Sequence, residues 1–234
     1  LPMTKRPIRH RIEKTGNKHS RAVFKDDTIV IRLARGLSKV EEKEHIDDLL
    51  ERMTRQVIEE REKNLIDPFR PLLDGGQSVT VTVGTGKKYT FSLLPGTRNH
   101  IQRTTKGFKV TVAPHVRRSQ LHRLLWNALS KAELPRIEKL IQELNERTYG
   151  IKIAKVRLKF ASSQWGSCSP KRIIMVNTAL LFTQPSILKY VIIHELAHRK
   201  VANHSPLYWK WVRWAMPRYD QAKELLNEYR LPSL

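Results

Sequence analysis

Apolar and polar residues alternate with a period of two in residues 21–33 (RAVFKDDTIVIRL) and again in residues 100–113 (HIQRTTKGFKVTVA). In each stretch a short polar turn, at residues 26–27 and 106–107, separates two apolar runs. This pattern is typical of β-hairpins. Apolar residues at helical spacing follow both hairpins. The sequence therefore predicts two hairpin-plus-helix units about 80 residues apart. Whether they are a duplication or two ordinary β-β-α segments stays open.

Helices are predicted where apolar residues recur three and four positions apart. We expect Ser38 to cap the first helix, where Glu41 and Glu42 suit the positive end of the helix dipole. Ser119 is expected to cap the second. A third helix, AELPRIEKLIQELNERTY, is expected to end near Gly150, a residue that readily adopts the left-handed conformation. The predicted inward positions are Ile46, Leu49, Leu50, Met53 and Val57 in the first helix and Leu121, Leu124, Leu125, Ala128 and Leu129 in the second.

Two prolines and a glycine pair in DPFRPLLDGGQS (residues 67–78) mark a boundary in the chain. We therefore expect residues 1–72 to form an N-terminal hairpin-helix appendage and residues 77–234 to form the main domain.

Two more strands are expected in the main domain. Residues 154–160 (AKVRLKF) alternate between an apolar face and a basic outer face, whereas residues 173–177 (IIMVN) are continuously apolar. Two such strands beside a helix predict a small α+β core, with β-hairpin-plus-helix units before it.

Candidate chemistry is concentrated in VIIHELAHRKVANHSPLYW, residues 191–209. A helix should begin near residue 184, because Thr183 is a plausible cap and Pro185 is tolerated in a first turn. His194 and His198 are four residues apart, so their side chains are neighbours on one side of this helix. Both imidazoles can therefore reach a single metal ion.

His204 can join them only if the helix ends first, because a continued helix would place it about 240° around the axis from His198. Asn203 tolerates the left-handed conformation, and Ser205 followed by Pro206 is typical of the cap and first residue of a new helix. The sequence thus predicts a chain reversal at the point where convergence requires one.

Three imidazole ligands with a fourth position left for water are typical of catalytic rather than structural zinc. Glu195 follows His194 directly, beside the ligands, where a base acting on metal-bound water belongs. Two other interpretations stay open: histidines that bind no metal, and a structural zinc beside an idle Glu195. Composition gives only about 0.02 chance occurrences of H-E-x-x-H in such a chain, which favours the metal site.

The charge balance adds a second candidate function. The 44 Lys and Arg against 22 Asp and Glu give a net charge of +22, and residues 76–234 hold 27 of the basic and 8 of the acidic residues. A basic C-terminal two thirds favours polyanions such as DNA, although a solvated basic surface is the simpler explanation. The alternative to a peptidase is therefore a nucleic-acid-binding module in which the metal only stabilises the fold.

Cysteine content and hydropathy narrow the other possibilities. The single cysteine, Cys168, excludes an internal disulfide and a thiolate zinc cluster, and it is interpreted as a small packed side chain. Apolar runs are only a few residues long and the chain shows no signal-peptide pattern, so we expect a cytoplasmic protein that does not enter a membrane. Oligomeric state cannot be inferred.

QWGSCS (residues 164–169), IIMVN and VIIHELAHRKVANHSPLYW, in that order, resemble the YgjP-like metallopeptidases, which are relatives of the SprT-like zinc proteases. The resemblance is close over about 150–215, consistent back to about 77 and faint before that. Gln164 departs from it, since many relatives have arginine there. The spacing of the third histidine also matches the metzincins, but Val201 replaces their glycine.

The resemblance implies a compact zincin-type domain over residues 77–234 with its metal-binding core at 150–215. It implies Zn²⁺ on His194, His198 and His204, with Glu195 as the general base of peptide-bond hydrolysis. The substrates would be proteins or peptides, and the SprT-like relatives act on proteins attached to DNA.

Three further residues are candidates for substrate binding. Trp165 and Gly166 either line a groove in which an extended peptide pairs with the chain, or fill the core beneath a tight turn. Tyr208 is a candidate for stabilising an oxyanion. The neighbouring tryptophans suit either base stacking or packing; they are Trp209, Trp211 and Trp214.

Overall fold

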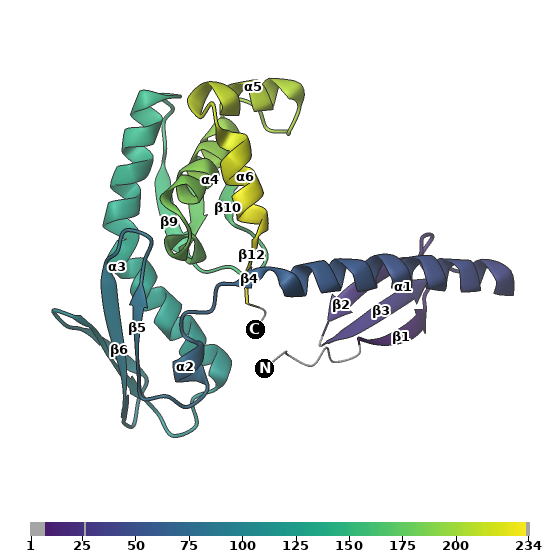
Figure 1. Ribbon diagram of the computed structural model, residues 1–234, viewed down its shortest axis with the longest axis horizontal. Coiled ribbons are helices and arrows are strands. Elements are labelled where there is room, and N and C mark those ends of the chain that lie inside the picture. Colours follow the sequence, from purple (N-terminus) through teal and green to yellow (C-terminus); the bar gives the residue numbers. More distant parts are fainter. Residues whose placement is uncertain (1–7, 26, 233–234) are drawn as a thin grey trace. The chain divides into compact units, whose positions relative to one another are not determined.

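The computed structural model describes residues 8–25 and 27–232, and the chain divides into two compact units, residues 1–64 and 65–234 (Figure 1). Residues 65–72, which the sequence assigned to the appendage, thus fall in the second unit. The reason is packing: the Phe69 ring meets the rings of Phe91 and Trp126 edge-on, each with centroids 5.0 Å apart. Burial of these aromatic rings, rather than the prolines and glycines of residues 67–78, decides the boundary.

The first unit is a three-stranded sheet with a long helix on one side (Figure 1). Strand β3 (Thr28–Leu33) lies between β1 (Arg9–Lys14), which runs parallel to it, and β2 (Arg21–Lys25), which runs antiparallel. The β2–β3 hairpin and helix α1 (Lys39–Glu62) are as predicted, although Asp26 of the turn lies outside the described residues. Strand β1 was not predicted, since its apolar content is a single Ile12. The core consists of Ile29, Ile31 and Leu33 with Ile46, Leu49, Leu50 and Met53 packed on them.

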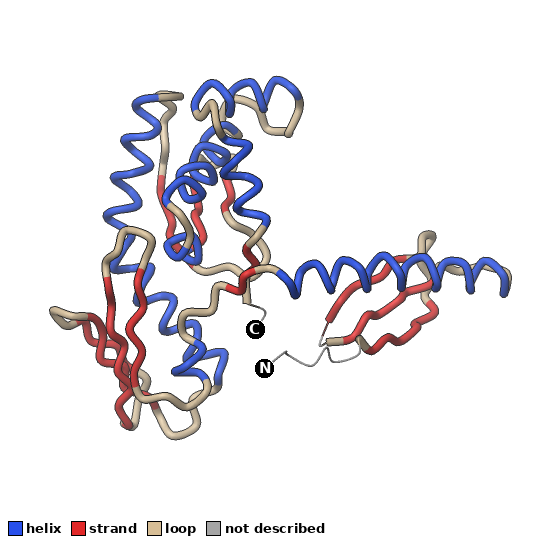
Figure 2. Tube along the Cα trace, in the orientation of Figure 1, coloured by secondary structure: helices blue, strands red, loops and turns tan. Residues whose placement is uncertain are grey.

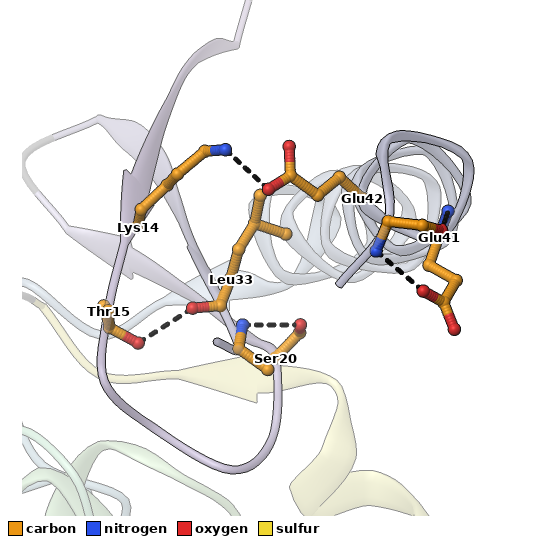
Figure 3. Close-up of polar contacts among 8 residues, drawn as sticks. Lys14, Thr15, Ser20, Leu33, Glu41 and Glu42 are labelled. Atoms are coloured by element: carbon orange, nitrogen blue, oxygen red, sulfur yellow. Dashed lines mark hydrogen bonds and ion pairs between the residues drawn. The ribbon is translucent and has the colours of Figure 1, made fainter. Parts of the chain in front are cut away.

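Polar contacts join the strands of this unit to the helix (Figure 3). Ser38 caps α1 as predicted: its hydroxyl accepts from the Glu41 N–H at 3.3 Å, and its own N–H donates to the Glu41 carboxylate at 2.7 Å. The Lys14 ammonium of β1 lies 2.5 Å from the Glu42 carboxylate of α1. Capping and this ion pair fix the start of the helix over the sheet.

Helix α3 (Arg118–Arg147) is the longest element of the second unit, and it corrects the prediction of two separate helices. It starts after Arg117, whose N–H donates to the Gln120 side chain at 3.1 Å, so Ser119 is not the cap. Pro135 lies inside the helix, where proline costs about 3 kcal/mol. Buried residues on both sides of Pro135, including Leu129 and Ile137, offset this cost.

A four-stranded sheet packs against part of α3. It contains β5 (Ser78–Thr82), β6 (Lys88–Pro95), β7 (His100–Arg103) and β8 (Gly107–Val112) in the order β5-β6-β8-β7, preceded by the short helix α2 (Arg70–Leu73). The predicted second hairpin is β7–β8, which pairs antiparallel. The second unit begins around β4 (Asn64–Leu65), and Ile66 donates its N–H to the carbonyl of Arg230 in β12 (Tyr229–Arg230) at 3.0 Å.

A three-stranded sheet packs against α3 and also contacts the helix that carries the candidate site (Figure 2). Strand β11 (Ile173–Asn177) lies between β9 (Lys155–Lys159), which is parallel, and β10 (Gly166–Cys168), which is antiparallel. Strands β9 and β11 were predicted, and the basic side chains of β9 are exposed as expected. The chain then continues through the 3₁₀ helix η1 (Thr178–Phe182) and helices α4 (Pro185–Ala197), α5 (Pro206–Ala215) and α6 (Tyr219–Asn227).

The mixed α/β architecture with small sheets agrees with the predicted α+β class. Among the described residues, no helix combines the length and the hydropathy that a membrane crossing requires.

Candidate metal centre

Helix α4 lies in the core of the second unit and delivers two histidines and a glutamate. Nine of its 13 residues are buried, including Ile187 and Ile192, each with no exposed surface. The polar His194 and Glu195 are therefore placed where water is scarce. Close packing of the buried residues around them holds these side chains in fixed positions.

The helix ends at the second histidine. His198 is the C-cap residue of α4, and the Val201 N–H closes the last turn on the carbonyl of Ala197 at 3.1 Å. The Asn203 side chain then accepts from the Ser205 N–H at 3.3 Å, and α5 begins at Pro206. The predicted interruption of the helix and the new start are both present.

This reversal carries His204 back to α4. Its Nε2 lies 3.2 Å from Nε2 of His194, and its ring centroid lies 4.8 Å from that of His198. One nitrogen from each of the three imidazoles falls within 4.8 Å of the other two. The sequence predicted this convergence, and the chain brings the three rings together.

The donor set fits a zinc ion. Nitrogens bound to tetrahedral zinc at about 2.0–2.1 Å lie about 3.3 Å from one another, close to the separation of the His194 and His204 nitrogens. The His194 nitrogen nearest to His204 is Nε2. The other ring nitrogen of His194, Nδ1, is buried and has no hydrogen-bond partner among the described residues. Three imidazole nitrogen donors at this spacing suit a borderline-soft divalent metal better than a hard cation.

The surroundings keep the imidazoles of His194 and His198 in the neutral form that metal binding requires. Burial, together with the neighbouring imidazoles, lowers the pKa of His194 to about 4. Burial also lowers the pKa of His198, against hydrogen bonds with the backbone of Val201 and Ala202 that raise it. These two donors need not lose a proton before they bind a metal at neutral pH.

Tyr208 lies beneath the three imidazoles. It is fully buried, and its ring centroid lies 5.3 Å, 4.7 Å and 4.8 Å from those of His194, His198 and His204. Its hydroxyl donates to the carbonyl of His194 at 2.9 Å, and this contact ties α5 to α4. The tyrosine is thus placed as a support for all three rings, with its hydroxyl proton already engaged.

Two of the three neighbouring tryptophans are packed in the fold. Trp209 stacks on the His204 ring with centroids 5.8 Å apart and also on Tyr219, and Trp211 meets Tyr149 edge-on. Trp214 is 58% exposed. Packing accounts for Trp209 and Trp211, while the base-stacking interpretation stays a prediction for Trp214.

Glu195 lies directly against strand β10. Its side chain is buried, and an ideal Cβ built on Gly166 would stand 2.6 Å from its Oε1. Burial raises the pKa of Glu195 to about 7. A carboxyl group with such a pKa exchanges protons readily near neutral pH, which suits a general base. Gly166 therefore sets the space available to Glu195, while its role in a groove or beneath a tight turn stays a prediction.

Asn177, at the end of β11, holds the loop that leads into β10. It has no exposed surface, its amide donates to the carbonyls of Ala161 and Gln164, both at 2.7 Å, and its oxygen accepts from the Ala179 N–H at 3.0 Å. Sequence reasoning missed this role. An asparagine closing an apolar strand was the available signal, because a buried amide needs several partners.

The remaining predicted residues lie close to this loop. Trp165 is half-buried against the core, and its carbonyl accepts from the Asn177 N–H at 2.9 Å. Burial raises the pKa of the half-buried Cys168 thiol, so it is protonated at neutral pH. Whether Trp165 touches substrate stays a prediction.

An H-E-x-x-H helix with a third histidine on the following turn is typical of metal-dependent hydrolases. The comparison with protein families gives the same class: the model for the YgjP-like metallopeptidase domain matches residues 18–229, nearly the whole chain. The chain therefore belongs to the YgjP-like metallopeptidase family. The match includes most of the first unit, in which sequence reasoning found only a faint resemblance.

Solved structures add less. The metallopeptidase zymogen of Pyrococcus abyssi abylysin is 25% identical with a TM-score of 0.33, and the match covers 38% of this chain and 87% of that one. The metallopeptidase zymogen of Methanocaldococcus jannaschii jannalysin is 20% identical with a TM-score of 0.34, over 38% and 90%. Likeness at this level carries no argument about mechanism. No curated protein matches the chain.

Proposed function

We propose that this chain is a zinc-dependent peptidase, with the metal on His194, His198 and His204 and Glu195 as the general base. The observation that carries the proposal is the meeting of three imidazole nitrogens within 4.8 Å next to a buried carboxyl group of the same helix. The zincin-type class of the domain, implied by the resemblance, is part of this proposal.

Zinc bound at this site would act as a Lewis acid, polarising a carbonyl and lowering the pKa of water towards ~7. The chain itself handles the proton. Glu195 accepts a proton from the attacking water and returns it to the leaving amine, a role that its raised pKa supports. Burial of Glu195 keeps bulk water from competing for that proton.

Strand β10 is the proposed substrate strand. It lies at the edge of its sheet and packs against α4, with Gly166 beside Glu195. An extended peptide that pairs with this edge would bring its backbone past the carboxylate, which is the strand-addition mode of recognition. Trp165, next to this edge, is the proposed side-chain contact.

DNA-associated proteins are the proposed natural targets, on the strength of the resemblance to SprT-like proteases and the basic surface. The competing function, a nucleic-acid-binding module with a structural metal, predicts salt-sensitive DNA binding without hydrolysis.

Metal removal and replacement test the proposal. The purified protein should contain about one zinc per chain and cleave an unfolded protein substrate, lose cleavage on chelation, and regain it with zinc. His204→Ala should lose both zinc and cleavage, whereas His115→Ala, a change at an exposed histidine, should lose neither. Zinc-loaded protein that cleaves no unfolded substrate would favour the binding module instead.

A further inference from the structure

The first unit separates its charges between two sides. Helix α1 carries nine acidic and five basic residues, whereas β1, β2 and β3 together carry six basic residues and one acidic residue. The net charge of this part of the chain is small because the basic residues of the sheet and the acidic residues of the helix nearly cancel. The sheet by itself is basic, and the helix by itself is acidic.

The basic side chains lie mostly on the side of the sheet that faces away from α1. Successive residues of a strand point to opposite sides, and Ile29, Ile31 and Leu33 pack towards the helix. Thr28, Val30 and Arg32 consequently point the other way, and the strand register assigns their partners to the same side. We call this side the open face; it consists of Arg9, Arg11, Glu13, Arg21, Val23, Lys25, Thr28, Val30 and Arg32.

Five cations share the open face with one carboxylate. Glu13 is bound by Arg11 at 2.9 Å and Arg32 at 3.0 Å, and these hydrogen bonds and charges lower its pKa. The other three cations, Arg9, Arg21 and Lys25, are exposed and form no ion pair with another described residue. The face thus offers uncompensated positive charge at both of its edge strands.

The uncharged residues of the face argue against an apolar partner. Val30 is only 2% exposed and Val23 is half-buried, so the described part of the face presents no large apolar side chain to solvent. It also carries no aromatic residue on which an unpaired base could stack. Recognition here would rest on charge alone.

The spread of the cations suits a phosphate backbone. Strands lie about 4.8 Å apart and rise about 3.3 Å per residue, so the charges cover roughly 10 Å by 13 Å. Duplex nucleic acid carries one negative charge per about 1.7 Å of its axis, so several phosphates fall within this length. An acidic protein segment would also bring apolar side chains, for which the described residues of this face offer only the buried Val30 and the half-buried Val23.

We propose that the open face of the first unit binds the phosphate backbone of duplex nucleic acid without reading its sequence. This site is separate from the basic surface of the second unit that the sequence indicated. It depends on neither zinc nor Glu195. If the proposed peptidase function also holds, the open face would hold the enzyme on nucleic acid while the second unit cleaves bound proteins.

Two triple variants of the full-length, zinc-loaded protein test the assignment. The first, Arg9→Gln/Arg21→Gln/Lys25→Gln, removes the unpaired charges of the open face. The matched control, Lys155→Gln/Arg157→Gln/Lys159→Gln, removes three exposed charges from β9 in the second unit. Binding of a 20-base-pair mixed-sequence DNA duplex is measured between 50 and 200 mM salt, beside a polyglutamate probe.

The open-face variant should bind the duplex at least tenfold more weakly at 100 mM salt. The slope of log affinity against log salt should fall by about 2 to 3, near 0.9 for each lost phosphate contact. The β9 control should stay within about threefold of wild type, and Arg9→Lys/Arg21→Lys should retain binding. Cleavage of an unfolded protein should be unchanged in all of these, and Glu195→Gln should bind the duplex like wild type.

Three results would overturn the inference: wild-type duplex affinity in the open-face variant, an equal loss in the β9 control, or polyglutamate binding as tight as duplex binding. The first two place the site elsewhere, and the third identifies an acidic protein segment as the partner. None of them bears on the peptidase chemistry, so the two proposals fail separately.

Discussion

Gly166 and Glu195 touch across the boundary between β10 and α4, so closely that a methyl group on Gly166 would lie 2.6 Å from a carboxylate oxygen of Glu195. Gly166→Ala should therefore push the Glu195 side chain out of position. We expect kcat to fall about 10²-fold, the scale of a misplaced catalytic group, with zinc content unchanged. The readouts are peptide cleavage and metal analysis.

Ser167→Ala, one residue along the same strand, is the control for Gly166→Ala and should keep near-normal cleavage. If Gly166→Ala cleaved as well as wild type, Glu195 would be free to move and the glycine would have no positioning role.

Asn177→Ala should weaken both the fold and catalysis. It leaves the carbonyls of Ala161 and Gln164 without their buried donor, at a cost of about 2–4 kcal/mol in the free energy of unfolding. Because that loop leads into β10, kcat should also fall while zinc content is kept. Urea unfolding and cleavage are the measurements, with the exposed Asn127→Ala as the control. Unchanged stability would contradict the role assigned to the amide.

Tyr208→Phe separates two roles of this residue. The hydroxyl donates to the His194 carbonyl, so its loss should cost about 0.5–1.5 kcal/mol of stability and leave kcat within about threefold. A hydroxyl that stabilised the oxyanion would instead cost about 10²–10³-fold in kcat. The kcat and the thermal unfolding of Tyr208→Phe are measured beside those of wild type. A small loss of stability with kcat nearly unchanged indicates a supporting role, and a large loss of kcat indicates a catalytic one.

His122 should make stability depend on pH away from the metal site. It is buried on α3 and accepts from the Trp126 indole N–H at 2.8 Å, and burial lowers its pKa to about 4. The unfolded chain takes up a proton on this residue below about pH 6.5 while the folded chain does not, so stability falls as the pH falls.

The contribution of His122 is complete above about pH 6.5 and is lost as the pH falls towards 4. His122→Leu should therefore shrink the difference in unfolding free energy between pH 7 and pH 5 by about 1–2 kcal/mol. Denaturant unfolding at both pH values measures it, with the exposed His115→Leu as the control. An undiminished difference would mean that another group carries the acid sensitivity.

The sequence predicted those parts of the structure that depend on local chemistry. The Ser38 cap, the β2–β3 and β7–β8 hairpins and the reversal before His204 all follow from turn, cap and spacing preferences of nearby residues. The convergence of His194 and His198 required only helical geometry, and Asn203 with Pro206 supplied the turn for the third ring.

What the sequence did not predict depends on contacts between distant segments. The prediction divided α3 at Pro135 because proline disfavours a helix interior, whereas core packing keeps the helix continuous. It also favoured Ser119 over Arg117 as the cap. The two hydrogen bonds that the Asn177 amide donates and the contact of Gly166 with Glu195 join residues 13 or more positions apart, which no local pattern contains. The charge separation of the first unit was hidden because strands and helix were counted together.

The most direct test of the central claim is zinc content and peptide cleavage measured together on Glu195→Gln. This change keeps the shape and burial of the side chain and removes its ability to accept a proton. The account predicts about one zinc per chain, as in wild type, and a loss of at least about 10²-fold in kcat/KM. Full zinc occupancy with wild-type cleavage would contradict it.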